Sequence, residues 1–277
     1  MIKYYANFRQ NDHLLKVLKN SFKQIQQNRW LILLLIKNQN KITYQRDIFG
    51  LVWLLIMPLV PILAYIFLAS IKVFNTVQEM PFVFYIVVGM FIWLLMSSII
   101  KKIMLSVKAE KNILRSTNLS MLVVMVSKMG EILFDSFIRL FAVIVVVMWL
   151  NIDISILSIL YFVLSLVPII IVSFAIGAIV AIVNLVSHDI EKAVDIFLRY
   201  GLFVSSVIFP FPDSGLLGII GDFNIFNTYI NGIRDIVFYG SVQNVALFGY
   251  TVLVTLFLFI LSLKLVYIFD YKVREYL

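Results

Sequence analysis

The chain has 277 residues, no cysteine and few charged residues. Without cysteine it cannot form disulfides, use a thiolate nucleophile or bind a metal through sulfur, and its redox compartment stays open. Charged residues make up 14% of the chain and hydrophobic residues 62%, whereas soluble domains carry about 25% charged residues. Too few polar side chains remain to cover a surface in water. The composition predicts a membrane protein, and its long apolar runs predict helices rather than a β-barrel.

Motifs for the common enzyme chemistries are also missing. The chain has no GxxxxGK[ST] phosphate loop and no HExxH metal motif, and His13 and His188 are its only histidines. No nucleophile, base and orienting group form a set, and no long soluble segment provides a polar active site. We therefore expect no ATP hydrolysis, no metal and no cofactor in this chain. A membrane-embedded enzyme is the weakest interpretation.

The apolar runs predict an all-α integral membrane protein with six transmembrane helices. A helix needs about 20 mainly apolar residues to cross a bilayer. The expected spans are residues 48–71, 80–100, 121–150, 154–187, 196–212 and 236–263. Residues 213–235 contain four glycines and Asp222, so we interpret them as two re-entrant half-helices that return to the same side. Residues 1–47 form a cytoplasmic, interfacial segment, and residues 48–277 form one transmembrane domain.

Basic residues gather on one side of this topology. Nine Lys and Arg lie in residues 1–47 and five in residues 101–115, whereas only Lys72 and Arg234 fall on the opposite side. The positive-inside rule therefore places both termini in the cytoplasm. It also accounts for most of the net charge of +8, so no nucleic-acid partner is expected.

The N-terminal segment has an amphipathic pattern. Leu14, Leu18, Phe22 and Ile25 recur at helical spacing, and three lysines fall on the other face. Such a helix lies on an anionic membrane surface. It either anchors the chain or has a role with a lipid substrate, and the sequence leaves both open. A second interfacial piece, residues 30–47, leads into the first span.

Two groups of residues inside the apolar runs, one charged and one aromatic, each have a functional and a structural interpretation. Glu131, Asp135 and Arg139 follow at four-residue intervals, so they share a helix face. They are either a proton or ion relay or a structural ion pair, which we favour, between Asp135 and Arg139. The aromatic and proline residues 209–212 either close a pore by excluding water or form an interfacial belt and a turn.

Weak motifs follow one another in a fixed order from about Trp30 to the C-terminus. The matching positions are Gly50, Trp53, Pro58, Pro81, Gly89, Asn112, Ile113, Leu114, Asn184, Asp189, residues 205–210, Asn227, Arg234 and Asp235. Together they resemble the permease subunit of type-2 ATP-binding-cassette exporters, in the branch that exports capsule, O-antigen and teichoic-acid polysaccharides. Ser120, Ser206 and Thr228 stand where that family usually has proline, and His188 stands where it has arginine.

The resemblance implies a bacterial cytoplasmic-membrane protein in which two copies form a channel for a lipid-linked polysaccharide. Two separate ATPase subunits, which bind ATP and Mg, would dock beneath it against residues 108–119. The resemblance assigns ATPase coupling to Asn112, Leu114, Arg115, His188 and Asp189, and the channel wall to Trp53, Tyr65, Tyr200 and Phe203. It assigns the outer gate to Phe209, Pro210, Phe211, Pro212 and Arg234, and binding of the lipid head group to Lys41 and Arg46. The rival interpretations are a drug or lipid exporter of the same superfamily and an ion-coupled secondary transporter.

Overall fold

The computed structural model describes residues 12–45, 80–117, 119–151, 156–187, 189–211 and 215–276, and a few positions between 52 and 67. These residues form helices and no strand. The helices are α2 (Leu14–Gln27), α3 (Arg29–Gln45), α5 (Phe82–Ala109), α6 (Lys111–Ser116), α7 (Met121–Trp149), α8 (Ile156–Asn184), α9 (Asp189–Tyr200), the 3-10 helix η1 (Gly201–Val204), α10 (Gly215–Phe223), α11 (Ile225–Tyr239) and α12 (Val245–Tyr276).

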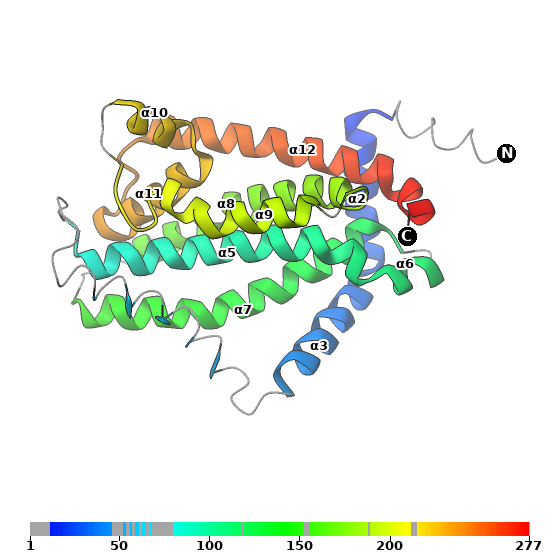
Figure 1. The fold of residues 1–277 in the computed structure, drawn as a ribbon, viewed down its shortest axis with the longest axis horizontal. Coiled ribbons are helices and arrows are strands. Elements are labelled where there is room, and N and C mark those ends of the chain that lie inside the picture. Colours follow the sequence, from blue (N-terminus) through cyan, green and yellow to red (C-terminus); the bar gives the residue numbers. More distant parts are fainter. Residues whose placement is uncertain are drawn as a thin grey trace.

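Four of these helices are long and apolar enough to cross a membrane. They are Phe82–Ala109, Met121–Trp149, Leu157–Asn184 and Val245–Asp270. They lie along the long axis of the molecule, with α6 at one end, here called the α6 end, and α10 and α11 at the other, the α11 end (Figure 1). The expected first span, residues 48–71, lies mostly outside the described residues, so the count of six spans stays a prediction.

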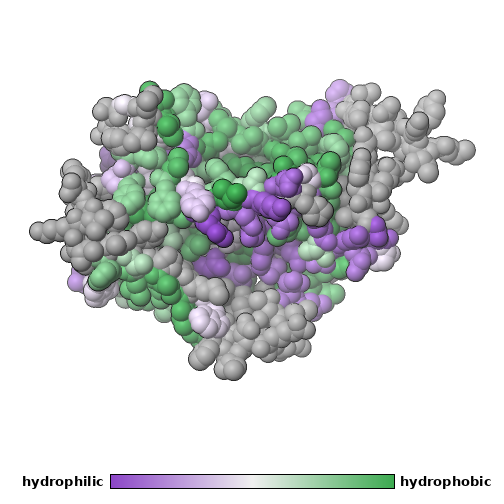
Figure 2. Space-filling model, viewed as in Figure 1, coloured by the Kyte–Doolittle hydropathy of each residue, from purple (hydrophilic) through white to green (hydrophobic). Residues whose placement is uncertain are grey.

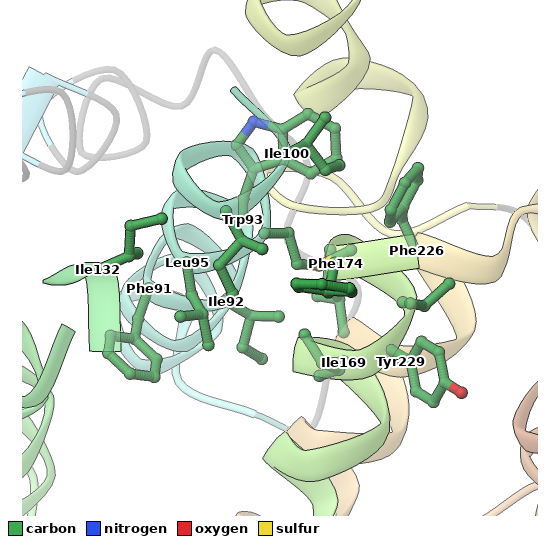
Figure 3. Close-up of a cluster of buried hydrophobic side chains, with 14 of the residues drawn as sticks. Phe91, Ile92, Trp93, Leu95, Ile100, Ile132, Ile169, Phe174, Phe226 and Tyr229 are labelled. Atoms are coloured by element: carbon green, nitrogen blue, oxygen red, sulfur yellow. The ribbon is translucent and has the colours of Figure 1, made fainter. Parts of the chain in front are cut away.

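Helix α5 is the centre of the bundle. In its most apolar window 78% of the residues are buried, against 22% in α12. Figure 3 shows Phe91, Ile92, Trp93 and Leu95 of α5 among side chains of α7, α8 and α11. A helix that is apolar all round is buried on every side, so α5 forms the core. The exposed apolar faces of α7 and α12 are left for lipid or for another protein.

A glycine allows α8 to pack closely on α5. A Cβ atom at Gly177 would come within 3.0 Å of the Ile103 Cβ and 3.1 Å of the Ile100 carbonyl oxygen. Helices within membranes associate largely by such close backbone approach, because lipid removes the hydrophobic drive between them. Gly177 therefore sets the separation of two candidate spans.

The expected fifth span, residues 196–212, is not one helix. Helix α9 ends at Tyr200, and η1 and a series of turns follow it. A Cβ atom at Gly201 would come within 2.9 Å of the Trp93 indole ring, and Ser206 has a φ of 47°. The close packing of Gly201 and the left-handed backbone of Ser206 prevent α9 from continuing as one helix to residue 212. Neither feature can be recognised from the apolar composition of the segment.

The last span begins later than the expected residue 236. Residues up to Tyr239 belong to α11, which is capped by Gly240 with a φ of 78°. A glycine in this conformation is a common helix stop. Asn244 then accepts a hydrogen bond from the Leu247 amide at 3.0 Å where α12 begins. The expected start is wrong because this stop and start lie inside the apolar run.

Candidate functional site: a polar seam and an arginine clamp

Polar side chains of α5 meet those of α7 on one side and of α9 on the other. Lys102 Nζ of α5 lies 2.6 Å from Glu131 Oε1 and 3.8 Å from Asp135 Oδ2 of α7. One turn deeper, Arg139 Nη1 donates a hydrogen bond to Ser98 Oγ at 3.4 Å. We call this group the polar seam; it consists of Ser98, Lys101, Lys102, Glu131, Asp135, Arg139 and Asp195.

Helix α9 joins the seam through an ion pair with α5. Lys101 Nζ lies 2.8 Å from Asp195 Oδ1. Lys101 and Lys102 follow each other in α5, so one points to α9 and the next to α7. Figure 2 shows hydrophilic atoms in a band over α9 and α5, with apolar areas above and below it. The seam therefore reaches the molecular surface.

The seam continues toward the α6 end through further ion pairs. Lys128 Nζ lies 2.7 Å from Glu110 Oε1 and 4.0 Å from Glu131 Oε2. Lys108 donates to Asn184 Oδ1 at 3.0 Å. Glu110 is the residue between α5 and α6. Charged contacts thus connect the beginning of α6 to α7, and the end of α5 to the end of α8.

The seam extends to the middle of an apolar helix. Arg139 is 18 residues from Met121 and 10 from Trp149, about 27 Å and about 15 Å along α7 at ~1.5 Å per residue. Ionisable groups at bilayer depth normally face protein or water rather than lipid. Since the Lys102 side chain keeps 38% of its surface exposed, this face of the bundle requires a polar neighbour.

At the α11 end, Arg234 is buried to 1% exposure. Its guanidinium donates to the backbone oxygens of Tyr85 (3.0 Å), Ser206 (2.6 Å) and Val207 (2.8 Å) and to Asn231 Oδ1 (3.0 Å). It also lies 3.4 Å from the centre of the Tyr85 ring, a cation–π contact. We call this arrangement the arginine clamp, because it joins α11, α5 and the turn after η1.

Two further residues complete the clamp. Tyr85 Oη donates to the Ser206 carbonyl at 2.8 Å, so that oxygen accepts from both side chains. A Cβ atom at Gly89 would lie 2.0 Å from Arg234 Nη2 and 2.9 Å from the Val207 oxygen. Only glycine leaves room for the guanidinium at this point of α5.

The residues assigned to the outer gate do not all reach the clamp. Arg234 is buried in it, whereas Phe211 packs near α10, where a Cβ atom at Gly221 would lie 2.8 Å from its Cδ2. Phe209 is half-buried and Pro210 exposed, and Pro212 lies outside the described residues. Asn224 separates α10 from α11 and accepts from the amide of Phe226 at 3.0 Å. Two short helices thus occupy the segment where two half-helices were expected.

The residues assigned to the channel wall are exposed where the structure describes them. Tyr200 ends α9 and Phe203 lies in η1, and both have large exposed surfaces. Trp53 is also exposed. Tyr65 lies outside the described residues. The exposed rings of Tyr200 and Phe203 are accessible to a substrate or to a second protein.

Three of the residues assigned to ATPase coupling lie in the short helix α6. Asn112 and Arg115 are exposed and Leu114 is buried. Asp189 is exposed at the beginning of α9, and its neighbour His188 lies outside the described residues. Of the two residues assigned to the lipid head group, Lys41 belongs to α3, and its side chain and Arg46 are not described.

The sequence did not predict the residues that pair with Glu131 and Asp135 in the polar seam or with Arg234 in the arginine clamp. Lys102 was expected in a cytoplasmic loop, as one of the five basic residues of 101–115, but it lies in α5, which continues to Ala109. No role was predicted for Lys128 or Glu110. The signal was the spacing of Ser98 and Lys102, which are four residues apart and therefore lie on one face of α5. Tyr85 carried no signal. No family model and no curated protein matches this chain.

Proposed function

We propose that this chain is the membrane-spanning permease subunit of an ATP-driven exporter that moves a lipid-linked or nascent surface polysaccharide across the bacterial cytoplasmic membrane. Four candidate spans support a membrane location. The order of motifs from Trp30 to the C-terminus supports the exporter class. The observation that carries the proposal is the polar seam, which gives a hydrophilic face to a bundle that is otherwise apolar.

A sugar polymer needs a path with hydrogen-bonding groups and flat apolar surfaces. The seam supplies the first along α5 and α7, and the exposed rings of Tyr200 and Phe203 supply the second. Rings stack on the C–H faces of sugars without holding them in one register, so a polymer slides past them. One chain presents only one wall, so a symmetric pair of copies encloses the path.

In this proposal the α6 end faces the cytoplasm. Two partner ATPase subunits bind ATP and Mg and contact Asn112 and Arg115 of α6, which are exposed. The link from Glu110 through Lys128 to Glu131 then carries a displacement of α6 to the seam. The proposal keeps six crossings, with a first span before residue 80 and with α9, η1 and the turns after them in place of the expected fifth helix. Helices α10 and α11 then form the re-entrant outer gate.

The proposal is tested by co-purifying this chain with its ATPase partner and measuring ATP turnover and surface glycan. The double variant Asn112→Ala, Arg115→Ala is expected to lose substrate-coupled ATP turnover and glycan export while the chain remains folded. The control Lys37→Gln, an exposed change on α3, is expected to keep both. Transport by the purified chain under an ion gradient, with no ATPase present, would show the proposal to be wrong.

The buried acids favour one second candidate, an ion-coupled transporter. Glu131 and Asp135 both lie in a candidate span and face Lys102. In that case Asp135→Asn would abolish transport and leave folding intact. Normal export by Asp135→Asn would remove this candidate. A drug or lipid exporter of the same superfamily is distinguished by Trp53→Ala with Tyr200→Ala, which reduces glycan export only if these rings line a sugar path.

A further inference from the structure

Helix α9 lies lengthwise against α5 and leaves a gap on the side of α8 (Figure 1). The gap is a groove of about 380 Å³ whose lining side chains are all apolar. Ala193 and Phe197 of α9 line one side, and Val180 and Val183 of α8 line the other. Along this groove α9 stands away from α8.

Helix α9 contacts α5 through polar groups. Trp93 Nε1 donates to the Leu198 carbonyl at 3.2 Å, and Lys101 Nζ lies 2.8 Å from Asp195 Oδ1. Ser97 is four residues from both Trp93 and Lys101, so it belongs to the same face of α5. Its hydroxyl oxygen is buried and forms no hydrogen bond within the described residues. A buried hydroxyl without a partner costs free energy, so this contact does not fully satisfy the two helices.

The two ends of α9 are held differently. At the C-terminal end, the backbone packs on Trp93, where a Cβ atom at Gly201 would come within 2.9 Å of the indole ring. Nearer the N-terminus the ion pair of Lys101 and Asp195 joins α9 to α5, and its side chains are 48% and 40% exposed. Exposed ion pairs contribute little stability. The C-terminal end therefore provides a pivot, and the rest of α9 can change position at low cost.

The charges released by such a movement do not become buried without a partner. Arg199 follows Asp195 by four residues on α9, a spacing at which an acid and a base attract each other. Lys101 is half-exposed and remains hydrated. Because Lys192 and Arg199 are exposed, the outer face of α9 meets water rather than lipid. Burial of the exposed apolar side chains of α9 in the groove is then favourable.

We propose that α9 is a movable helix with two resting positions on α5. In the position that the structure describes, Asp195 holds α9 over Lys101 and Ser97. In the second position, α9 turns about its C-terminal end and its apolar side fills the groove on α8, which uncovers Lys101 and Ser97 at the seam. The ion pair favours the first position. This inference does not depend on the substrate or the energy source of transport.

The first test measures the approach of α9 to α8. The chain has no cysteine, so Val180→Cys with Ala193→Cys places the only two thiols on opposite sides of the groove. The purified full chain is oxidised with copper phenanthroline in mild detergent, and disulfide formation is followed by counting the remaining thiols. We expect Asp195→Asn to raise the rate about two- to fivefold, as the loss of an exposed ion pair allows. The matched control is Lys192→Gln, which removes a charge that pairs within α9 and is expected to leave the rate unchanged.

A second measurement separates movement into the groove from simple loosening of α9. Ser97→Cys as the single thiol reports uncovering of α5 by its rate of reaction with a hydrophilic maleimide. We expect Asp195→Asn to raise this rate and Val180→Phe, which fills the groove, to lower it, with helical content and gel-filtration profile unchanged. Unchanged rates in either variant would overturn the proposal. If Asp195→Asn speeds the maleimide reaction but not the disulfide, α9 detaches from the bundle instead of entering the groove, and the proposal is wrong.

Discussion

Lys102 and Arg234 both place a positive charge inside a bundle of apolar helices, but their partners differ. Lys102 faces two carboxylates, Glu131 at 2.6 Å and Asp135 at 3.8 Å, and remains 38% exposed. Arg234 is buried, and its four hydrogen bonds go to three backbone oxygens and one amide oxygen. Carboxylates neutralise the charge of Lys102, whereas the dipoles of carbonyl groups stabilise the charge of Arg234.

The different partners of Lys102 and Arg234 indicate which end of the bundle is rigid. A lysine is a compact charge on a flexible stem and exchanges partners, whereas the planar guanidinium holds several acceptors in a rigid fork. The clamp therefore defines one arrangement of α5, α11 and the turn at Ser206. The seam permits several, since Lys102, Lys128 and their acids lie within about 4 Å of alternative partners. We expect movement at the α6 end and rigidity at the clamp.

Removing the clamp has the largest expected effect on stability. Arg234→Met removes the guanidinium donors from three backbone oxygens, of which only the Ser206 oxygen keeps a second side-chain donor, the Tyr85 hydroxyl. Hydrogen bonds to charged groups contribute about 1.5–3 kcal/mol each. We expect a loss of at least ~3 kcal/mol, seen as a lower midpoint of thermal unfolding by circular dichroism in detergent. The control is Arg199→Met, an exposed arginine of α9. Equal midpoints for the two variants would mean that the clamp stabilises nothing.

A methyl group in the clamp is the next largest change. Gly89→Ala places a Cβ atom 2.0 Å from Arg234 Nη2, so the guanidinium or α5 has to shift. Overpacking of this kind costs about 1–3 kcal/mol. The matched control is Gly249→Ala in α12, where no described atom beyond the local helix backbone lies within 4 Å of the new Cβ. Alanine is the better helix former by about 1 kcal/mol, so we expect the control to be unchanged or more stable in the same unfolding assay.

Removing the lysine of the seam is expected to have a smaller effect. Breaking a fully buried pair costs about 3–5 kcal/mol, but Lys102 is partly exposed. We expect Lys102→Met to cost about 1–2 kcal/mol by thermal unfolding, because water still reaches the seam. Glu131→Gln in the same chain should restore part of the loss, since it removes the carboxylate left without its cation. If Lys102→Met lost as much stability as Arg234→Met, the α6 end and the clamp would be equally rigid, contrary to our expectation.

The sequence predicted the elements of the fold better than their contacts. The apolar runs at 121–150 and 154–187 agree closely with α7 and α8 because length and hydrophobicity alone decide them. The run at 196–212 failed because Gly201 packs on Trp93, which is more than 100 residues away in the chain. The four candidate spans therefore follow from composition, and the break between α9 and α10 does not.

The candidate sites were predictable in part for the same reason. Glu131, Asp135 and Arg139 form a pattern within one helix, which the sequence shows directly. Their partners Lys102 and Ser98 come from another helix, and the register between α5 and α7 decides the pairing. The clamp combines Tyr85 and Gly89 with Arg234, about 150 residues apart, and no local pattern marks such a combination.

The ion pair between α5 and α9 is expected to contribute least. Lys101 and Asp195 are 48% and 40% exposed, and exposed ion pairs are typically worth about 0.2–1 kcal/mol. We expect Lys101→Met, Asp195→Asn and the double variant to unfold within ~1 kcal/mol of the wild type, with a coupling energy no larger. If the coupling energy between Lys101 and Asp195 instead approaches the stability lost in Arg234→Met, the ion pair holds α9 on α5 as firmly as the clamp holds α11. Rigidity would then extend along the whole face of the bundle, and α9 could not move relative to the seam during transport.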